Sequence, residues 1–504
     1  MAINPLIPGF QDARRSGDLF TSMRTSLNDL QRQIGSGKRS ETYGALGTER
    51  RTSLDARARL SQIDGYERVI KDAELRIKIL SQSTERFSKM ALESKNDASA
   101  SAFLPNVNGR TPGQQVTDEK IKVAIDMLNT QINGRYLFSG RSADIKPVAD
   151  YNLMMNGDGT RAGVLQLINE RRQADLGASG LGRTIVGGAG ASATLTEEAA
   201  GLAYGFDIAG GGTNNTNISA TFTAGPPANI GFTLTSLPVE GDKVSVNLNL
   251  PDGTSETITL SAKTTVAGGA SANAFQIGAS TAATGANLRN ALTAALQEKA
   301  GSALSASSAI VATRDFFSGT ATNPPPRVPG PPFNTATLPP AAGTAANTVI
   351  WYQGDDTSTS ARQTSAVRVG DTQTVGVGAQ ANEGAFKEYM SQVVAFASDQ
   401  FLPSDPFAQS RYSAYSSRLR VNLADSGANA IKDIAIEFGQ ASASVNSAKE
   451  RQQATKSLLQ ETLSGVEDAN IEEVSASLLA LQTRLQATYQ TTSIISKLSL
   501  TNFL

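Results

Sequence analysis

The residue patterns that could support chemistry are few, and the first is a glycine-rich stretch near the N-terminus. Residues 35–40 read Gly-Ser-Gly-Lys-Arg-Ser, the composition of a phosphate-binding loop, in which backbone N–H groups and a lysine hold phosphate oxygens. The spacing of that loop is missing, because Arg39 follows Lys38 and Arg32 stands where the first glycine should be. Glycines in this position are typical of a turn that ends a helix, and we predict such a turn here.

Paired carboxylates and arginines are the other candidates. Asp355-Asp356 and Glu472-Glu473 are adjacent in the sequence, so on a helix or strand their side chains diverge, and both pairs are predicted to be solvated surface. Arg135 and Arg171-Arg172 are predicted to form local salt bridges or stacking contacts. The sequence contains no Cys and no His, and no nucleophile, base and orienting group can be assembled from it. We therefore predict a protein that is not an enzyme and that binds no cofactor and no metal.

Charge and hydropathy exclude several classes of partner. The chain has 504 residues and a net charge of −1, so it has no field that would attract nucleic acid or an anionic membrane. No segment has the roughly 18 apolar residues needed for membrane insertion, and the N-terminus lacks the pattern of a cleavable secretory signal. Pro5 and Pro8 are predicted to keep residues 1–10 out of a helix.

The elements that must position any site begin with long helices at both ends of the chain. A seven-residue apolar repeat predicts helices from Asp18 to the turn at 35–37, over 49–101, over 431–466 and over 469–504. Polar residues such as Thr84 and Gln452 interrupt the stripes and should weaken each helix pair. The stripe and end residues predicted to form an assembly interface are Phe20, Met23, Leu27, Leu30, Ile34, Ile63, Ile70, Ile77, Leu80, Ile471, Val474, Leu478, Leu481, Leu485, Leu498, Phe503 and Leu504.

Between the two ends the helical period is lost. We predict an α + β multidomain protein in which residues 1–145 and 381–504 pair as a long antiparallel coiled-coil-like rod. Residues 146–380 form an inserted β-rich outer domain, with a stiff Pro-rich connector at 323–332. The expected strands are 232–237, 243–250, 256–260, 348–355 and 365–369, with a hairpin at Pro251-Asp252-Gly253, and the expected shorter helices are 114–133, 285–300 and 382–397.

Several stretches together carry a resemblance to the bacterial flagellin family. Residues 34–39, Ile-Gly-Ser-Gly-Lys-Arg, are similar to the turn after the family's first helix. Residues 466–474, Val-Glu-Asp-Ala-Asn-Ile-Glu-Glu-Val, are similar to its acidic break before the final helix, and the ending Ser-Leu-Thr-Asn-Phe-Leu504 matches in kind. Residues 133–140 and 351–355 resemble the hook-associated branch, which joins hook to filament.

The resemblance covers roughly residues 15–150 and 345–504. It implies an extracellular structural subunit that leaves the cell through the flagellar export channel without a cleavable signal peptide. The partners it implies are other copies of the chain, the hook-side junction protein, flagellin and an export chaperone. The large Ser/Thr/Gly-rich insertion departs from the junction branch, so a filament-forming flagellin remains an alternative.

Other interpretations also stay open at this point. A secreted adhesin or surface-layer protein could use a β-rich middle to bind a receptor, without any need for paired termini. The helical ends could also form an ordinary stable bundle. We expect instead that residues 1–30 and 471–504 are partly disordered in the monomer and become ordered on assembly, because each stripe is only marginally buried within one molecule.

Overall fold

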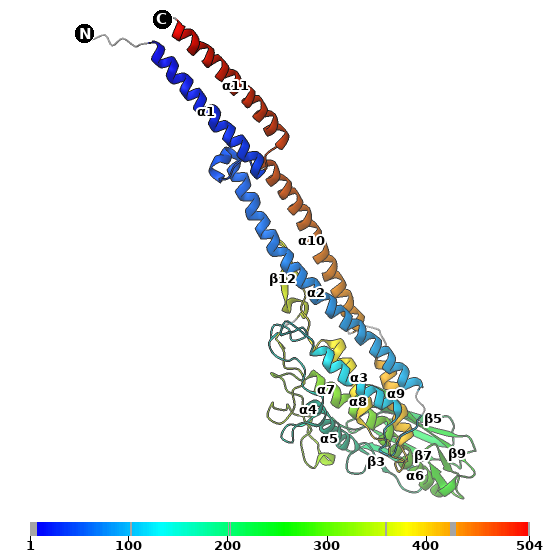
Figure 1. Ribbon diagram of the computed structural model, residues 1–504. Coiled ribbons are helices and arrows are strands. Elements are labelled where there is room, and N and C mark those ends of the chain that lie inside the picture. Colours follow the sequence, from blue (N-terminus) through cyan, green and yellow to red (C-terminus); the bar gives the residue numbers. More distant parts are fainter. Residues whose placement is uncertain are drawn as a thin grey trace. The chain divides into compact units, whose positions relative to one another are not determined.

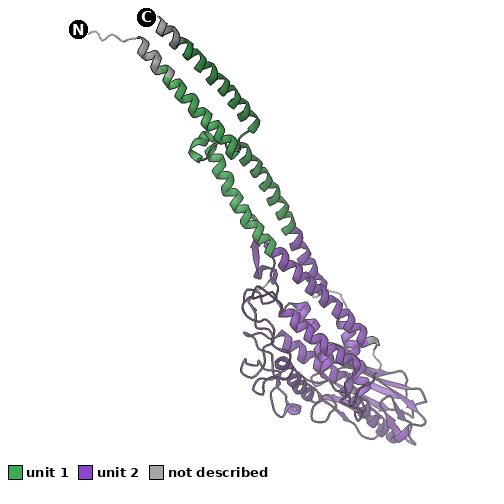
Figure 2. Ribbon diagram, viewed as in Figure 1, with its two compact units in different colours: residues 1–72, 368–374, 444–504 green, residues 73–367, 375–443 purple. Residues whose placement is uncertain are grey.

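The computed structural model describes residues 8–100, 103–199, 201, 203–357, 360–423 and 430–501. The fold is mixed α + β, which confirms the predicted class, with long helices toward both ends of the chain and sheets between them (Figure 1). It divides into two compact units. Unit 1 comprises residues 1–72, 368–374 and 444–504, and unit 2 comprises residues 73–367 and 375–443 (Figure 2). This division falls at residues other than the sequence boundaries at 145 and 380, because helices α2 and α10 contribute to both units.

Unit 1 is built from helices. They are α1 (Pro8–Ser36), the short helix η1 (Tyr43–Glu49), the first part of α2 (Arg50–Ala100), the last part of α10 (Ile431–Glu467) and α11 (Ile471–Thr501). The expected bounds of α2 and α10 are confirmed closely. The expectation that Pro8 stays outside a helix is wrong, since α1 begins at Pro8 and not near Asp18. A proline in the first turn has no intrahelical hydrogen bond to lose, and its fixed φ suits the helix.

Helices α1 and α11 lie side by side and run in opposite directions (Figure 1). The rings of Phe20 and Tyr489 contact each other with centroids 5.1 Å apart. Met23 on α1 and Val474 and Leu485 on α11 are buried. Phe20 and Met23 lie three residues apart on α1, and Leu485 and Tyr489 lie four apart on α11, which is the spacing that keeps side chains on one face of a helix.

Unit 2 contains two larger sheets. The first has the order β3-β4-β7-β6, and the second β10-β11-β9-β8-β5. All neighbours are antiparallel except the parallel pair β9 and β11. The strand bounds are β3 Thr184–Gly187, β4 Ser192–Glu197, β5 Asp207–Thr213, β6 Ile218–Thr223, β7 Asn229–Leu234, β8 Lys243–Asn249, β9 Ser255–Lys263, β10 Ala270–Ser271 and β11 Ala274–Gln276. The predicted β8–β9 hairpin is confirmed, and its turn uses Gly253 at φ +84°.

Helix α6 (Thr281–Lys299) packs against these sheets. A π-helical turn η3 (Ala300–Leu304) joins α6 to α7 (Ser305–Ser318), which packs against other helices of unit 2. Leu292 and Leu296 of α6 pack in the same core as Phe232 of β7 and Leu260 of β9. The strands alternate buried and exposed residues, as in Lys243–Asn249, because successive side chains point to opposite faces of a sheet. The predicted helix over 285–300 is thus confirmed.

The remaining elements surround this core. They are α3 (Pro112–Leu128), β1 (Gln131–Ile132), β2 (Arg135–Tyr136), α4 (Tyr151–Asn156), α5 (Val164–Leu176), η2 (Ala267–Gly269), η4 (Phe333–Thr335), η5 (Arg362–Thr364), β12 (Ala366–Arg368), β13 (Thr374–Gly376), α8 (Gly384–Ser398) and α9 (Ala408–Asn422). Residues 146–380 therefore contain α4, α5, α6 and α7 besides their strands. Helix α5 was missed because it buries Glu170, Arg171 and Asp175 as well as apolar residues, which hides the apolar period.

Two expectations for the second half of the insertion are wrong in detail. The predicted strand over 348–355 makes only single bridges, such as Tyr352 with Val148. The Pro-rich segment is not a free connector, because Arg327 pairs with buried Glu170 of α5 through its Nε at 2.8 Å. Its backbone also exchanges two hydrogen bonds with Ala341. Proline rings leave few backbone donors, so the segment is held mainly through this arginine.

Candidate functional site

In unit 1, two of the stretches that carry the resemblance meet in one joint. The turn after α1 and the break between α10 and α11 form an antiparallel bridge at Lys38 and Asp468. The backbone N–H of Arg39 donates to the Glu467 carbonyl at 2.8 Å, and that of Ala469 donates to the Gly37 carbonyl at 2.9 Å. Gly37 has φ +67°, which ends α1 as a glycine commonly does and confirms the predicted helix-ending turn. We call residues 37–39 and 467–469 the terminal joint.

A buried glutamate organises the charges of the terminal joint. Glu467 is 6% exposed and accepts hydrogen bonds from Arg57 Nε at 2.8 Å and Nη2 at 2.6 Å, and from Ser53 Oγ at 2.6 Å. The hydrogen bonds from Arg57 are the main cause that lowers the pKa of Glu467 to about 2, against the opposing effect of burial. Lys38 Nζ donates to Asp468 Oδ1 at 2.5 Å and lowers the pKa of that carboxyl.

The terminal joint rules out phosphate binding by the glycine-rich stretch. The ammonium of Lys38, which would have to reach a phosphate, is already paired with the carboxylate of Asp468, and it lies 3.8 Å from Glu467 Oε2. An incoming phosphate would meet two carboxylates and would be repelled. The arrangement can fix the place where α1 ends against the place where α11 begins, because the turn after α1 and helix α2 both pair with residues 467 and 468.

A second set of contacts in unit 1 ties α2 to α10. Lys456 Nζ on α10 donates to Asp64 Oδ1 and Glu67 Oε2 on α2, both at 2.7 Å. The tip of the β12–β13 hairpin lies against both helices. Asp371 accepts from Tyr66 OH at 2.9 Å, and the Val369 carbonyl accepts from Gln452 Nε2 at 3.1 Å. Gln452, a polar residue that interrupts the apolar stripe of α10, therefore holds a third segment, the β12–β13 hairpin, against the two helices.

The predicted interface residues occupy three kinds of environment. Buried are Met23, Ile63, Ile70, Val474 and Leu485 in unit 1, and Ile77 and Leu80 in unit 2. Half-buried are Phe20, Leu27, Leu30, Ile34, Leu478 and Leu481, while Ile471 is 54% exposed. The side chain of Leu498 and residues Phe503 and Leu504 lie outside the described part of the chain.

Unit 1 also exposes apolar side chains that the stripe did not include. Leu458 is 63% exposed, Leu479 66%, Tyr489 56% and Ile494 55%. The sequence signal was available, because Leu479 follows a stripe leucine directly and Ile494 lies one residue outside the expected spacing. Apolar side chains on more than one face of a helix indicate that one partner helix does not cover it fully.

In unit 2, the two other resemblance stretches also meet. The N–H of Asp355 donates to the Ser139 carbonyl at 3.0 Å, and Tyr352 OH donates to the Asp355 carbonyl at 3.1 Å. Asp355 is only 8% exposed, so the expectation that it is solvated surface is wrong. Its carboxylate accepts from the N–H and hydroxyl of Thr357, which closes a local turn and allows burial. Glu472 and Glu473 are exposed, as expected.

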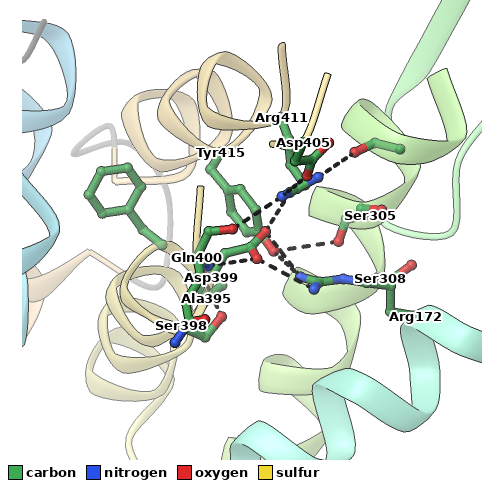
Figure 3. A network of polar contacts seen from close by, with 12 residues as sticks. Arg172, Ser305, Ser308, Ala395, Ser398, Asp399, Gln400, Asp405, Arg411 and Tyr415 are labelled. Atoms are coloured by element: carbon green, nitrogen blue, oxygen red, sulfur yellow. Dashed lines mark hydrogen bonds and ion pairs between the residues drawn. The ribbon is translucent and has the colours of Figure 1, made fainter. Parts of the chain in front are cut away.

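A network of buried ion pairs joins four segments of unit 2 (Figure 3). Asp399, in the loop after α8, accepts from Arg172 of α5 at 3.2 and 3.4 Å and from Arg411 of α9 at 2.8 Å. Arg172 also donates to Tyr415 OH at 2.9 Å. Arg411 reaches the Gly301 carbonyl of the π-helical turn at 3.1 Å. Burial raises the pKa of Tyr415, which therefore stays a neutral phenol.

This network holds its four segments together through ion pairs and leaves no charge without a partner. The two guanidinium groups neutralise Asp399 and, through Arg411, Asp405, and the oxygens of Asp399 are occupied by donors from the protein itself. Arg172 does form a salt bridge, but its partner Asp399 lies far away in the sequence, so the expectation of a local pair is wrong for Arg172. Arg171 pairs within its own helix with Asp175 at 2.8 Å.

A cavity of about 380 Å³ in unit 2 is lined in part by Arg183, Glu197, Tyr204 and Phe222. Its polar groups are already engaged. Arg183 donates to the Ala174 and Ala336 carbonyls and to Glu198. The two oxygens of Glu197 accept the N–H groups of Ile208 and Ala228. The cavity thus has the size of a ligand pocket but presents few free polar groups to a ligand.

Within the described residues, no helix is long enough and apolar enough to cross a membrane. No family model, no curated protein and no solved structure matches the chain.

Proposed function

We propose that the chain is a structural subunit of the bacterial flagellum that joins hook to filament by stacking of its terminal helices. In this proposal the terminal helices pair as a coiled-coil-like rod and then pack against neighbouring copies. The chain acts outside the cell, and its partners are other copies of itself, the hook-side junction protein, flagellin and an export chaperone.

The observation that carries this proposal is the incomplete burial of the α1–α11 pair. Met23, Val474 and Leu485 of these helices are buried, whereas Leu479, Tyr489 and Ile494 remain more than half exposed. Stacking with further copies would remove these side chains from water at about 1.5–3 kcal/mol for each one fully buried. The same contacts would offset the entropy of ordering residues 1–30 and 471–504.

The terminal joint gives a second line of support. The two stretches that resemble flagellin at 34–39 and 466–474 are far apart in sequence, yet they form one ion-paired turn in unit 1. A subunit that stacks through its ends needs α1 to end and α11 to begin at defined residues. The ion pairs of Glu467 with Arg57 and Lys38 fix these residues.

The test is a comparison of cells with and without the chain by electron microscopy. A hook–filament junction subunit is needed in few copies, so its loss should leave bare hooks and release filament monomer into the medium. Loss of the filament itself, with the chain present in thousands of copies per cell in the wild type, would instead identify the alternative, a filament-forming flagellin. Normal filaments in the absence of the chain would refute both.

A matched pair of variants tests the role of the terminal helices. Leu479→Asp places a charge on the exposed apolar surface of α11, and Thr491→Asp places one at an exposed polar position of the same helix. We expect the first to be exported but not incorporated, and the second to be incorporated normally. Equal incorporation of both variants would contradict stacking through α11.

A further inference from the structure

The cavity of about 380 Å³ in unit 2 lies at the edges of both larger sheets. Strand β5 is the last strand of one sheet and β6 is the last strand of the other, and Asp207 of β5 and Phe222 of β6 both line the cavity. Its volume lies within the range of small-molecule sites, which are lined mainly by apolar and aromatic side chains with a few polar groups. The charges and rings of its lining therefore decide which ligand it suits.

The one positive charge among the described lining residues is already balanced. Arg183 donates from Nη1 to Glu198 Oε2 at 3.1 Å, and its Nε and Nη2 donate to the carbonyls of Ala174 and Ala336 at 2.6 and 2.8 Å. All three nitrogens of the guanidinium thus have acceptors within the protein. The described lining therefore offers no free cation to an anionic ligand.

Two carboxylates line the same cavity without a counter-ion. Glu197 accepts the N–H groups of Ile208 and Ala228, both at 2.9 Å, and Asp207 accepts from Asn249 Nδ2 at 3.1 Å. All three donors are neutral, and no Lys or Arg in the described part of the chain pairs with either carboxylate. Because Ile208 directly follows Asp207, its hydrogen bond brings Glu197 to the same end of β5. Uncompensated negative charge in a partly enclosed cavity attracts cations.

An aromatic ring of the lining is exposed to water. Phe222 is 40% exposed, whereas Tyr204 and Phe206 of the same cavity are each 3% exposed. A Cβ atom on Gly210 would lie 3.9 Å from the Phe222 ring, so the ring borders the bare backbone of β5 at its bulge. The guanidinium of Arg171 lies over the Tyr204 ring at 5.2 Å, but no cation of the described chain lies over Phe222. The face of Phe222 is therefore free to attract one.

These features favour an organic cation over a metal ion. Within the residues that the structure describes, no group of three or more Asp, Glu, His or Cys side chains is placed to hold a metal. Hard metal ions take several oxygen ligands, and a phenyl ring supplies none. An alkylammonium group is attracted by carboxylates and by aromatic faces together. A volume of about 380 Å³ also has room for an alkyl chain beside the nitrogen.

We propose that this cavity binds a small alkylammonium compound. The positive nitrogen pairs with Asp207 and Glu197, and the alkyl part packs against Phe222. The inference goes beyond the proposed function, because stacking of the terminal helices does not use this cavity. A lysine side chain of another protein carries the same ammonium group, and the experiment separates this source from a dissolved amine.

The experiment measures binding of n-butylammonium to the full chain by ligand-observed NMR, with neutral 1-butanol as the ligand control of similar size. The variants are Asp207→Asn and Phe222→Leu, both at exposed positions, so the core of unit 2 is left unchanged. Asp126→Asn is the matched control, because it removes an exposed carboxylate of α3 that does not line the cavity. Thermal unfolding of each variant checks that the fold is kept.

Wild type and Asp126→Asn should bind n-butylammonium equally well, and 1-butanol about tenfold or more weakly, as expected for a lost charge-assisted contact. Asp207→Asn should weaken n-butylammonium about tenfold, because one of the two carboxylates is neutralised. Phe222→Leu should weaken it about two- to fivefold, because only the attraction of the ring is lost.

Equal binding of 1-butanol and n-butylammonium would show that the cavity does not recognise charge, and would overturn the proposal. An equal loss of affinity in Asp126→Asn and Asp207→Asn would do the same, as would no binding to the wild type at tens of millimolar. Much tighter binding of Nα-acetyl-lysine methylamide than of n-butylammonium would replace the dissolved amine by a lysine side chain of a partner. None of these results bears on the proposed function, because the terminal helices are unchanged in every variant.

Discussion

Unit 1 and unit 2 bury their side chains to very different extents. The largest fully buried side chains of the described residues, among them Trp351, Tyr389, Phe87 and Phe275, all lie in unit 2. Most side chains buried in unit 1 are small or aliphatic, such as Ala56, Ile63 and Val474, and Glu467 is a charged exception. Aromatic residues remove the most apolar surface from water when they are buried. Unit 2 therefore has a core of large aromatic side chains, whereas unit 1 is held together by smaller apolar ones.

The same contrast holds for charge. In unit 2, Asp399 pairs with Arg172 and Arg411 in the interior (Figure 3). In unit 1, most of the ion pairs, such as Lys38 with Asp468, are about half exposed, and Glu467 is the buried exception. Exposed pairs contribute little stability, while a buried charge that loses its partner is strongly destabilising. Polar contacts therefore stabilise the fold of unit 2, whereas in unit 1 they mainly set where the helices lie against each other.

The largest difference between the units should appear in hydrogen exchange of the monomer. We expect the amides of α11 to open with a free energy of about 0–2 kcal/mol, because one helix pair with few buried side chains stabilises them weakly. The amides of β8 and β9 should open only with global unfolding, at about 5 kcal/mol or more. Full protection of residues 478–494 in the monomer would refute this distinction, and assembled protein provides the comparison.

Within unit 2, Asp399→Asn should cost about 3–5 kcal/mol, because it leaves Arg172 and Arg411 buried without their shared anion. Unfolding in urea can be followed by the fluorescence of Trp351, which is fully buried and is the only tryptophan. Asp405→Asn is the matched control, since Asp405 pairs with the same Arg411 but is more exposed. Equal stability of the two variants would mean that the buried pairs of Asp399 stabilise unit 2 no more than the more exposed pair of Asp405.

Within unit 1, acid should open the terminal joint before it affects the core of unit 2. The pKa of Glu467 is lowered from its ordinary value of 4.5 to about 2 in the folded protein. Its pairing with Arg57 therefore stabilises the joint fully above the ordinary value and is lost as the pH falls toward about 2. Hydrogen exchange of the Arg39 and Ala469 amides, corrected for the intrinsic rate, measures this opening.

Glu467→Gln is the control for that titration. It removes the titrating carboxylate, so the two amides should exchange faster at neutral pH and should show no further loss of protection in acid. Acid-dependent opening that persists in Glu467→Gln would assign the pH dependence to another group of the joint.

The smallest effect is expected for the exposed pair of the same joint. Lys38→Met should change the stability of unit 1 by about 0.5 kcal/mol or less, because Lys38 and Asp468 are 47% and 42% exposed and water screens them. Tryptic cleavage after Arg39 is a sensitive readout. Cleavage accelerated as strongly as in Arg57→Gln would show that the exposed pair matters as much as the buried one.

The sequence predicted best where the apolar period and the turn residues agree. The bounds of α2 and α10, the β8–β9 hairpin at Pro251–Gly253 and the helix end at Gly37 all follow from local rules. The sequence-based prediction failed for helices that bury polar residues. In α5, Glu170 and Asp175 are buried because they accept hydrogen bonds from residues distant in the sequence. Asp355 was wrongly assigned to the surface, because its carboxylate is buried by a local turn with Thr357 that adjacency to a second aspartate does not predict.

The sequence by itself determined the mixed α + β class, the long terminal helices and the absence of Cys and His, because these depend on residue type and on spacing along the chain. Only the tertiary structure decided which charges meet. Glu467 with Arg57 and Asp399 with Arg172 join positions that no local pattern relates. From the sequence alone, a charged residue is expected to be solvated. It becomes a partner in a buried ion pair only when folding removes the water around it.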